Sequence, residues 1–541
     1  MKMIFSMIIS FGLLSAFPAL AKKTTSKSDV QNHSEKLELT PPGPLADLAY
    51  YPWMTADNFN KQQKLAIERS KVNHSRTISS TDTLPPDYLA FIDHWVKLQT
   101  TQDLDQALIA LEAAVQKPET SLSLRFVGNQ LLPLRSFRAF IYKMVNLAEQ
   151  AQPRAVHSVL LSFVQQSNQF LKVYLPEHRW QLIFDYITQP DSKDEKQFAT
   201  VRDLQSYILS GSGEKGAPKS IMTALRDAAS GLKKLEAEMN TGRVVWDNRI
   251  LYGGNTFKDN VERFRILRAV DNHAALAAIH ANIAGLNFFC AYTFNNYFNL
   301  LGELGQLSGL DGFSVANVAS NMIGLDVGKH PDVQGAPAYD RYTVMMKPKF
   351  SNTFLLYEDH SFGQNQMSAA YLAIKESVQE SALVWEELKG HPSDQEGSFL
   401  VDIVNPYSRT AGLTINKMLD IANAEGEGSL VTSPVTGDSV KVNLSAFFSA
   451  PPKNLLALLP QSFADKNLFR KTKTFKDGGT ISYRNYDRGR PLTWSRGAYG
   501  NLFPELKDKQ GTGPEVGQYS RVLSQTWGGG LVGLPLAIFV Q

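Results

Sequence analysis

Cysteine is almost missing from this chain, since its 541 residues include a single one, Cys290. One cysteine excludes an intramolecular disulfide and the covalent attachment of a haem. The neighbours of Cys290 are apolar and uncharged, which predicts a buried, unreactive thiol, because reactive cysteines sit in electropositive, partly exposed places. Without disulfides the chain must be stabilised by its core, and its length is sufficient for about two to four domains.

The chain also lacks a large excess of positive or negative residues. Lysine and arginine number 55 and aspartate and glutamate 52, so the formal net charge is +3. This small excess gives no argument for binding nucleic acid, and we expect no nucleic-acid partner. Hydrophobic residues at 43% and charged residues at 20% are typical of a soluble globular protein.

Long hydrophobic runs without polar residues are missing from the body of the chain. Its most apolar stretch, Ala274–Phe294, still contains His280, Asn282 and Asn287. We therefore expect no transmembrane span in the mature chain, and interpret this stretch as the central helix of a core. The residues expected in the largest hydrophobic cluster are Ile279, Ile283, Leu286, Phe289, Phe294 and Phe298.

Motifs of catalysis and cofactor binding are missing as well. The chain has no Gly-x-Ser-x-Gly sequence and no histidine followed by the glutamate of a zinc-protease helix. The segment Gly211–Ser220 is rich in glycine, but a phosphate loop needs lysine directly after its second glycine, and Ala217 and Pro218 intervene. We expect no cofactor, and we interpret Pro218 as the first residue of a helix.

The sequence does contain an export signal at its N-terminus. Lys2 precedes an apolar run that ends at Leu14, and Ala19-Leu20-Ala21 supplies the small residues of a cleavage site. This order predicts a signal peptide over residues 1–21 and a mature chain that begins at Lys22, in the periplasm or outside the cell. The apolar run is shorter than the about 20 residues of a membrane span, and no cysteine follows the cleavage site closely enough for a lipoprotein.

The remaining chain divides by its pattern into three segments. Residues 22–45 are rich in Lys, Ser and Thr and are expected to form a flexible linker. Residues 46–320 show helical periodicity with short polar breaks, which predicts a domain of helical hairpins. Residues 321–541 add extended runs and a turn at Thr436-Gly437-Asp438, which predicts a mixed α/β domain. The predicted fold is therefore mainly α, with a helical-hairpin N-terminal region followed by a mixed α/β C-terminal region.

The same patterns predict individual elements. The expected helices are 84–98, 103–118, 122–149, 155–171, 198–209, 368–389 and 410–424, and the expected strands are 243–246, 342–346, 353–357, 399–404, 430–432 and 440–442. The composition of residues 310–340 indicates a domain boundary there.

One further helix, after Pro218, has the clearest periodicity. Its apolar residues follow one another at spacings of 4, 3, 4, 3 and 4, and they are Ile221, Leu225, Ala228, Leu232, Leu235 and Met239. This heptad seam favours packing against a neighbour in the same chain. The alternative is a coiled coil that self-associates or binds a partner, although such a coil normally continues for three to four heptads or more.

Two groups of polar residues are weak candidates for chemistry. Glu358-Asp359-His360 is a dense cluster after an extended run, and could supply catalytic residues or metal ligands. His273 and His280 share one helix face about 10 Å apart, which is farther than the i,i+3 or i,i+4 spacing of ligands to one metal. We therefore expect two core or surface histidines and no metal site.

Two Glu-Ser pairs, Glu376-Ser377 and Glu380-Ser381, lie on an expected helix. Each resembles the Glu-Ser of lytic transglycosylases, but the downstream glycine and aromatic residues of that family are missing. A glycosidase acid needs a raised pKa in a pocket. We expect these carboxylates on a solvated helix face.

Basic and aromatic residues alternate near the C-terminus. The candidate binding patch consists of Arg484, Tyr486, Arg488, Arg490, Trp494 and Arg496. Arginine beside stacking aromatics suits anionic or glycan surfaces. The alternative is a segment whose aromatic rings pack on the domain while its arginines bind backbone carbonyls.

Two hypotheses of function follow from these patterns. The first is an exported, periplasmic, non-enzymatic protein of the bacterial cell envelope that binds or scaffolds an envelope protein or an anionic glycan or lipid surface. The second is an envelope hydrolase that acts on cell-wall polymer, for which Glu358, Asp359 and His360 are the first residues to consider. A deep pocket lined by these three residues and other polar groups would favour the enzyme. A convex surface at these residues, together with an exposed patch formed by the arginine- and tyrosine-rich stretch, would favour binding. The oligomeric state stays open.

Overall fold

The computed structural model describes residues 84–523 with several gaps. The gaps are 150–176, 191–194, 212–217, 243, 253–262, 298, 301–344, 346, 391–407, 434–436, 460–469, 475–479, 485–492, 513–514, 517 and 520–521. The expected signal peptide, the linker, the helix 155–171, the boundary at 310–340, the strand 399–404 and most of the strand 342–346 therefore lie outside the described residues.

Helices form most of the described chain, so the fold is mainly α, as predicted. The α-helices are α4 (Pro86–Trp95), α5 (Thr101–Val115), α6 (Leu122–Leu131), α7 (Phe140–Glu149), α9 (Glu177–Thr188), α10 (Val201–Ser210), α11 (Ile221–Thr241), α12 (Arg249–Tyr252), α14 (Ala269–Ala291), α18 (Phe362–Gly390), α19 (Ser408–Asn423) and α20 (Leu444–Ser449). The short 3-10 helices are η3 (Leu132–Phe137), η4 (Pro348–Phe350), η5 (Asp359–Ser361), η8 (Leu455–Leu458) and η10 (Pro504–Leu506).

The strands form antiparallel two-stranded sheets. They pair β1 (Val244–Asp247) with β2 (Phe264–Leu267), β3 (Ser429–Thr432) with β4 (Ser439–Val442), β5 (Arg470–Thr474) with β6 (Thr480–Arg484), and β7 (Thr493–Arg496) with β8 (Gln510–Thr512). The hairpin β3–β4 was expected, and Gly437 in its turn has φ +75°, which favours glycine. The pairing of β5 with β6 and of β7 with β8 was missed because those segments lack clear alternation.

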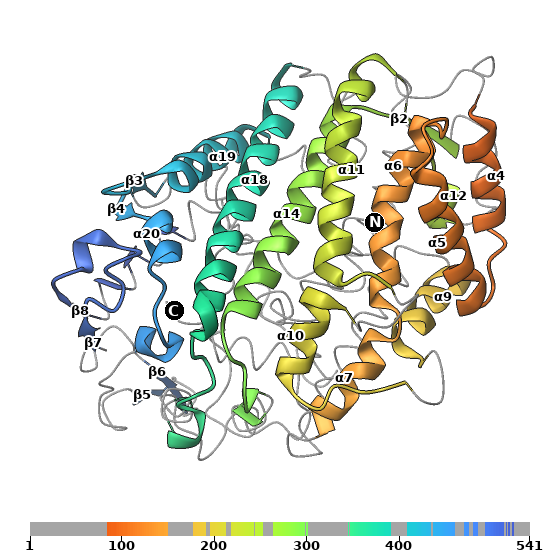
Figure 1. The fold of residues 1–541 in the computed structure, drawn as a ribbon. Helices are drawn as coiled ribbons and strands as arrows, with labels where there is room; N and C mark the ends of the chain where they lie inside the picture. Colours follow the sequence, from red (N-terminus) through yellow and green to blue (C-terminus); the bar gives the residue numbers. More distant parts are fainter. Residues whose placement is uncertain are drawn as a thin grey trace.

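The helices α6, α11, α14 and α18 lie side by side in one row (Figure 1). Neighbours run antiparallel: Asn272 near the start of α14 donates to Leu232 O in the second half of α11. Ser377 in the second half of α18 donates to Ala277 O in the first half of α14. Each inner helix of the row therefore has a helix on both sides, which explains why α14 lacks a polar face.

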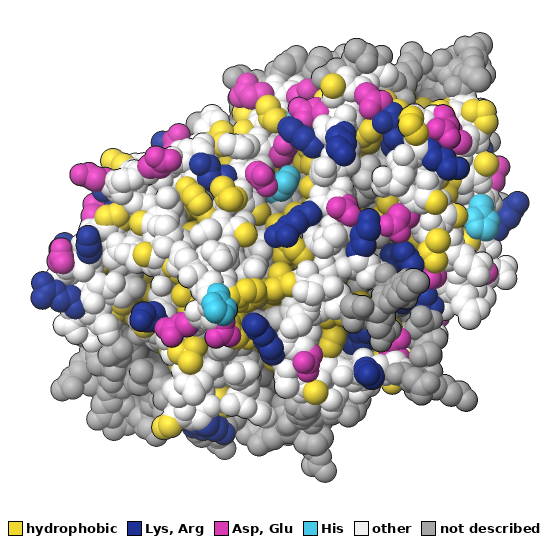
Figure 2. Space-filling model, in the orientation of Figure 1, with side chains coloured by type: hydrophobic (Ala, Val, Ile, Leu, Met, Phe, Trp, Pro, Cys, Tyr) yellow, Lys and Arg dark blue, Asp and Glu magenta, His cyan; other side chains and the backbone are white. Residues whose placement is uncertain are grey.

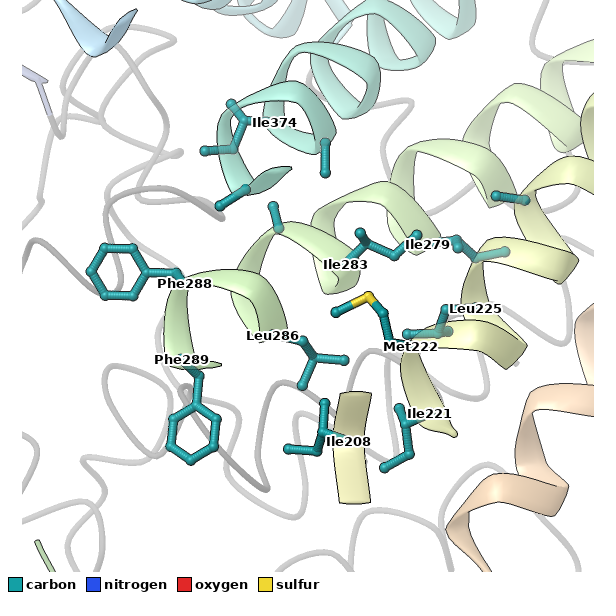
Figure 3. Close-up of a cluster of buried hydrophobic side chains, with 14 of the residues drawn as sticks. Ile208, Ile221, Met222, Leu225, Ile279, Ile283, Leu286, Phe288, Phe289 and Ile374 are labelled. Atoms are coloured by element: carbon teal, nitrogen blue, oxygen red, sulfur yellow. The ribbon is translucent and has the colours of Figure 1, made fainter. Parts of the chain in front are cut away.

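The apolar helix α14 is the centre of the core. It is long and apolar enough to cross a membrane, but most of it is buried inside the protein, as in the core helix of a soluble domain. Figure 3 shows its isoleucines, leucine and phenylalanines packed with side chains of α10, α11 and α18. The predicted core residues Ile279, Ile283, Leu286, Phe289 and Phe294 are buried, and Phe298 lies outside the described residues.

The heptad seam of α11 is buried within the chain, as the first interpretation predicts. All six seam residues are at most 6% exposed and belong to the main hydrophobic cluster. The helix begins at Ile221, so the prediction that it begins at Pro218 is wrong. The reason is that Ser220 accepts a hydrogen bond from the backbone N–H of Thr223 and caps the helix.

Two other predicted helix bounds are also corrected by local chemistry. Thr100 and Asp103 bond each other's backbone N–H in a capping box, so α5 begins before Asp103, at Thr101. The expected helix 122–149 is interrupted, because Pro133 lies in the 3-10 turn η3 between α6 and α7.

A buried amide closes the C-terminal end of α14. Gln205 of α10 donates through Nε2 to Phe289 O at 2.8 Å and to Tyr292 O at 2.7 Å. Its Oε1 accepts from the Tyr357 hydroxyl at 2.7 Å. These bonds satisfy carbonyls that a helix end leaves without partners. Cys290 lies beside them and is fully buried, as predicted, and burial raises the pKa of its thiol.

One hydrophobic core crosses the expected domain boundary at residue 320. The main cluster extends from Tyr88 in α4 to Leu523. It joins α14, which precedes the expected boundary, to α18, which follows it. The two expected domains therefore share a core where these helices meet.

Candidate functional site

A cleft of about 440 Å³ opens beside α11. Its volume is within the range of small-molecule sites, about 300–1,000 Å³. One wall is a face of α11, at positions three or four residues apart: Ala224, Asp227, Ala228, Ser230, Gly231, Lys234 and Leu235. This wall is about 16 Å long, because a helix rises 1.5 Å per residue.

The other wall comes from the helices that precede α11 in the chain. The end of α5 contributes Glu112, Val115 and Gln116, while α6 and η3 contribute Arg125, Asn129, Leu132, Arg135 and Ser136. Close approach of the two walls requires Gly231, since a Cβ there would lie 2.0 Å from Oδ1 of Asn129. On the face in Figure 2, basic and acidic side chains are intermixed over α6 and α11.

Three of the four cations that line the cleft are held by carboxylates. Arg125 bonds both carboxylate oxygens of Glu238, and this hydrogen bonding lowers the pKa of Glu238. Arg135 Nη1 lies 3.1 Å from Glu112 Oε2. These pairs fix two guanidinium groups against the wall.

The two cleft lysines differ in their surroundings. Lys219 Nζ lies 2.9 Å from Asp227 and 3.0 Å from Glu112, and the hydrogen bond from Lys219 to Asp227 is the main cause of its raised pKa. Lys234 is exposed and forms no ion pair or hydrogen bond with the part of the chain that the structure describes. Arg125, Arg135 and Lys219 are therefore paired with carboxylates, and Lys234 is the cation of the lining that has no carboxylate partner among the described residues.

Sequence reasoning missed this cleft, although one signal pointed to it. Ala224, Ala228 and Gly231 repeat at helical spacing on α11, and Ala228 also belongs to the heptad seam. Small residues at such spacing allow close approach to a helix, but spacing alone does not distinguish a neighbouring helix from a ligand.

The predicted histidines face α18, where each meets a glutamate. His273 Nδ1 lies 2.6 Å from Glu380 Oε2, and His280 Nδ1 lies 2.8 Å from Glu376 Oε2. The described residues contain no group of three or more His, Cys, Asp or Glu side chains placed to hold a metal ion. Burial lowers the pKa of His280 more than Glu376 raises it.

Lysine and glutamate complete a ring around His273. Lys233 Nζ lies 3.1 Å from Glu380 Oε1 and 2.6 Å from Glu236 Oε2, and His273 Nε2 lies 3.9 Å from Glu236 Oε1. The ring joins α11, α14 and α18. Burial acts to raise the pKa of Glu380, but hydrogen bonds from His273 and Lys233 outweigh it and lower that pKa. A carboxylate held ionised in this way is unsuited to act as a general acid.

The two Glu-Ser pairs were expected on a solvated helix face, and this expectation is confirmed for Glu376 and wrong for Glu380. Glu376 is on a solvated face as predicted, with its side chain 55% exposed. Glu380 is only 7% exposed and Ser377 4%, because α14 covers that side of α18. Sequence alone could not reveal this, since the partner of Glu380 is 107 residues away.

A second buried carboxylate lies at the end of β1. Asp247 is fully buried, and its oxygens accept from Arg249 Nε and Nη2 and, at 2.9 Å, from Arg263 Nε. Arg249 also pairs with Asp93, at 2.8 Å, whose side chain is 57% exposed. Burial outweighs these contacts and raises the pKa of Asp247 to about 6.

The structure places Glu358, Asp359 and His360 together on an exposed turn. They lie at η5, directly before α18, and all three are exposed. Glu358 lies 3.9 Å from Lys453, and both side chains are largely solvated. None of the three lines the cleft of α11.

Only part of the candidate binding patch is described. Trp494 is 4% exposed and its indole N–H donates to Leu458 O at 2.9 Å, while Arg496 Nε donates to Asp508 O at 3.0 Å. Trp494 and Arg496 therefore agree with the alternative interpretation, in which the aromatic rings pack on the domain and the arginines bind backbone carbonyls. The side chain of Arg484 and the residues Tyr486, Arg488 and Arg490 lie outside the described part.

Comparison of this chain with protein-family models, curated proteins and solved structures found no match.

Proposed function

We propose that this chain is an exported, non-enzymatic binding protein of the bacterial cell envelope, and that it binds its partner in the cleft between α6 and α11. The cleft is the observation that carries the proposal. Its volume, about 440 Å³, is suited to a ligand. Its lining also combines fixed ion pairs with one unmatched lysine, which gives a ligand both hydrogen-bonding groups and a charge to recognise.

The proposal also includes the expectations from the sequence. Residues 1–21 direct export, the mature chain acts in the periplasm, and residues 46–320 and 321–541 form the helical-hairpin and mixed α/β regions. The exposed positions of Glu358, Asp359 and His360 support binding over hydrolysis, since a hydrolytic site needs a pocket that orients its substrate.

A retention experiment tests the cleft. Immobilised mature protein is incubated with solubilised envelope extract, and the retained components are compared between wild type, Ser230→Trp and Arg226→Trp. Ser230 lines the cleft, and Arg226 is exposed on the same helix outside the lining, so the pair introduces the same ring at two places.

We expect a component that wild type and Arg226→Trp retain and Ser230→Trp loses. Equal retention by all three proteins, or retention by none, would overturn binding in the cleft. Fractionation of cells tests export separately, and a chain that stays in the cytoplasm with its N-terminal residues attached would overturn that part.

A further inference from the structure

We propose that the cleft binds a glycan that carries a carboxylate on its repeating unit, as bacterial cell-wall glycan does, and that Lys234 binds this carboxylate. The inference rests on the proposed function and names the ligand class of the same site. It follows from the charges of the cleft, the polarity of its lining and its shape.

The charges of the cleft favour an anionic group at one end. At the end near the start of α11, Lys219 is held by Asp227 and Glu112. Towards the other end, Glu238 already has both oxygens occupied by Arg125, and Lys234 remains without a carboxylate among the described residues. A ligand carboxylate at Lys234 would form a charge-assisted hydrogen bond with the lysine that has no such partner among the described residues.

The uncharged part of the lining fits sugar hydroxyl and acetamido groups. Such groups both donate and accept hydrogen bonds, and the cleft offers the exposed amide of Gln116 and the exposed hydroxyl of Ser230. The larger apolar side chains of the lining are only Val115, Leu132 and Leu235. A lipid acyl chain would need a more continuous apolar surface, so the lining favours a glycan over a lipid.

The shape of the cleft favours a ligand in the form of a chain. The α11 wall extends over about three helical turns, and Ala224 and Ala228 are small residues along it, while Asn129 packs against the helix at Gly231. An elongated ligand can therefore lie along this wall between Lys219 at one end and Lys234 at the other.

Two disaccharides that differ only in a carboxylate test the inference. The acidic probe is N-acetylglucosaminyl-N-acetylmuramic acid, and the neutral probe is diacetylchitobiose, which lacks the lactyl group. Each is titrated calorimetrically into the mature protein, into Lys234→Met and into the control Arg226→Met, and inorganic phosphate serves as a third probe. Both substitutions remove one exposed lysine or arginine charge from α11, and equal unfolding midpoints would verify that both variants fold.

We expect the acidic disaccharide to bind wild type about tenfold or more tightly than the neutral one, which corresponds to one charge-assisted contact. Lys234→Met should abolish this difference, and Arg226→Met should preserve it. Equal affinity for both disaccharides, a difference that survives in Lys234→Met, phosphate that binds as tightly as the acidic disaccharide, or no binding at all would each overturn the inference. The retention experiment assumes nothing about ligand chemistry, so a cleft-dependent component found there would leave the proposed function standing.

Discussion

The clusters around Asp247 and Glu380 are alike in composition, but the pKa values of their carboxyl groups are shifted in opposite directions. Each is a carboxylate in the interior that accepts hydrogen bonds from two basic side chains. Yet the pKa of Asp247 is raised to about 6, whereas that of Glu380 is lowered.

Access to water explains the difference. Asp247 is fully buried, so ionising it costs the whole of its hydration. Glu380 lies beside Lys233, whose side chain is 56% exposed, and it is paired where the helix row meets solvent. The number of ionic partners therefore does not decide whether a buried carboxylate is charged, because the residual hydration of the cluster shifts the balance.

Removing Asp247 should have the largest effect on stability. Asp247→Ala leaves Arg249 and Arg263 without their buried acceptor, and arginine cannot release its charge. We expect a loss of about 3–5 kcal/mol in the free energy of unfolding, measured by urea denaturation. The control Asp93→Ala removes the exposed partner of Arg249 and should cost less than about 1 kcal/mol. Equal losses in the two variants would contradict the role given to burial.

The pH dependence of Asp247 should be the next largest effect. Because its pKa is raised from 3.8 to about 6 on folding, the folded state binds the proton more tightly, and the stabilisation present below about pH 4 is lost as pH rises through 6. The loss amounts to about 3 kcal/mol. Urea denaturation at pH 4 and pH 7 captures most of this loss, as the change in the unfolding free energy of wild type minus the same change in Asp247→Asn. An equal change in the two proteins would show that Asp247 does not titrate in this window.

Removing the charge of Glu380 should have a smaller effect, of opposite pH dependence. Its lowered pKa means that its contribution is present above pH 4.5 and is lost on acidification through the folded pKa. Glu380→Gln should cost about 1–3 kcal/mol at pH 7, since Lys233 can turn to solvent. Glu376→Gln, one turn away on the same helix and half-exposed, should cost less than about 1 kcal/mol. If thermal and urea unfolding showed no difference between the two variants, the ring around His273 would contribute nothing.

The row of helices around Glu380 shows how much of the fold could be predicted from the sequence. Local periodicity correctly predicted α11, the burial of its seam and the core role of α14, because each depends on residues a few positions apart. The same reasoning assigned Glu376 and Glu380 to one solvated face. No residue near them in the sequence indicates that α14 covers Glu380 and leaves Glu376 exposed. The candidate site was out of reach for the same reason: the cleft needs Asn129 and Gly231 to meet, and only the folded chain brings α6 against α11.

The amide of Gln205 at the end of α14 has a consequence for the lifetime of the folded molecule. It joins backbone carbonyls 84 and 87 residues away and a tyrosine hydroxyl 152 residues away. Contacts that close loops of this length are made late in folding, because the chain loses more entropy in closing them. Interactions formed after the rate-limiting step mainly slow unfolding. We therefore expect this side chain to slow unfolding more than it speeds folding.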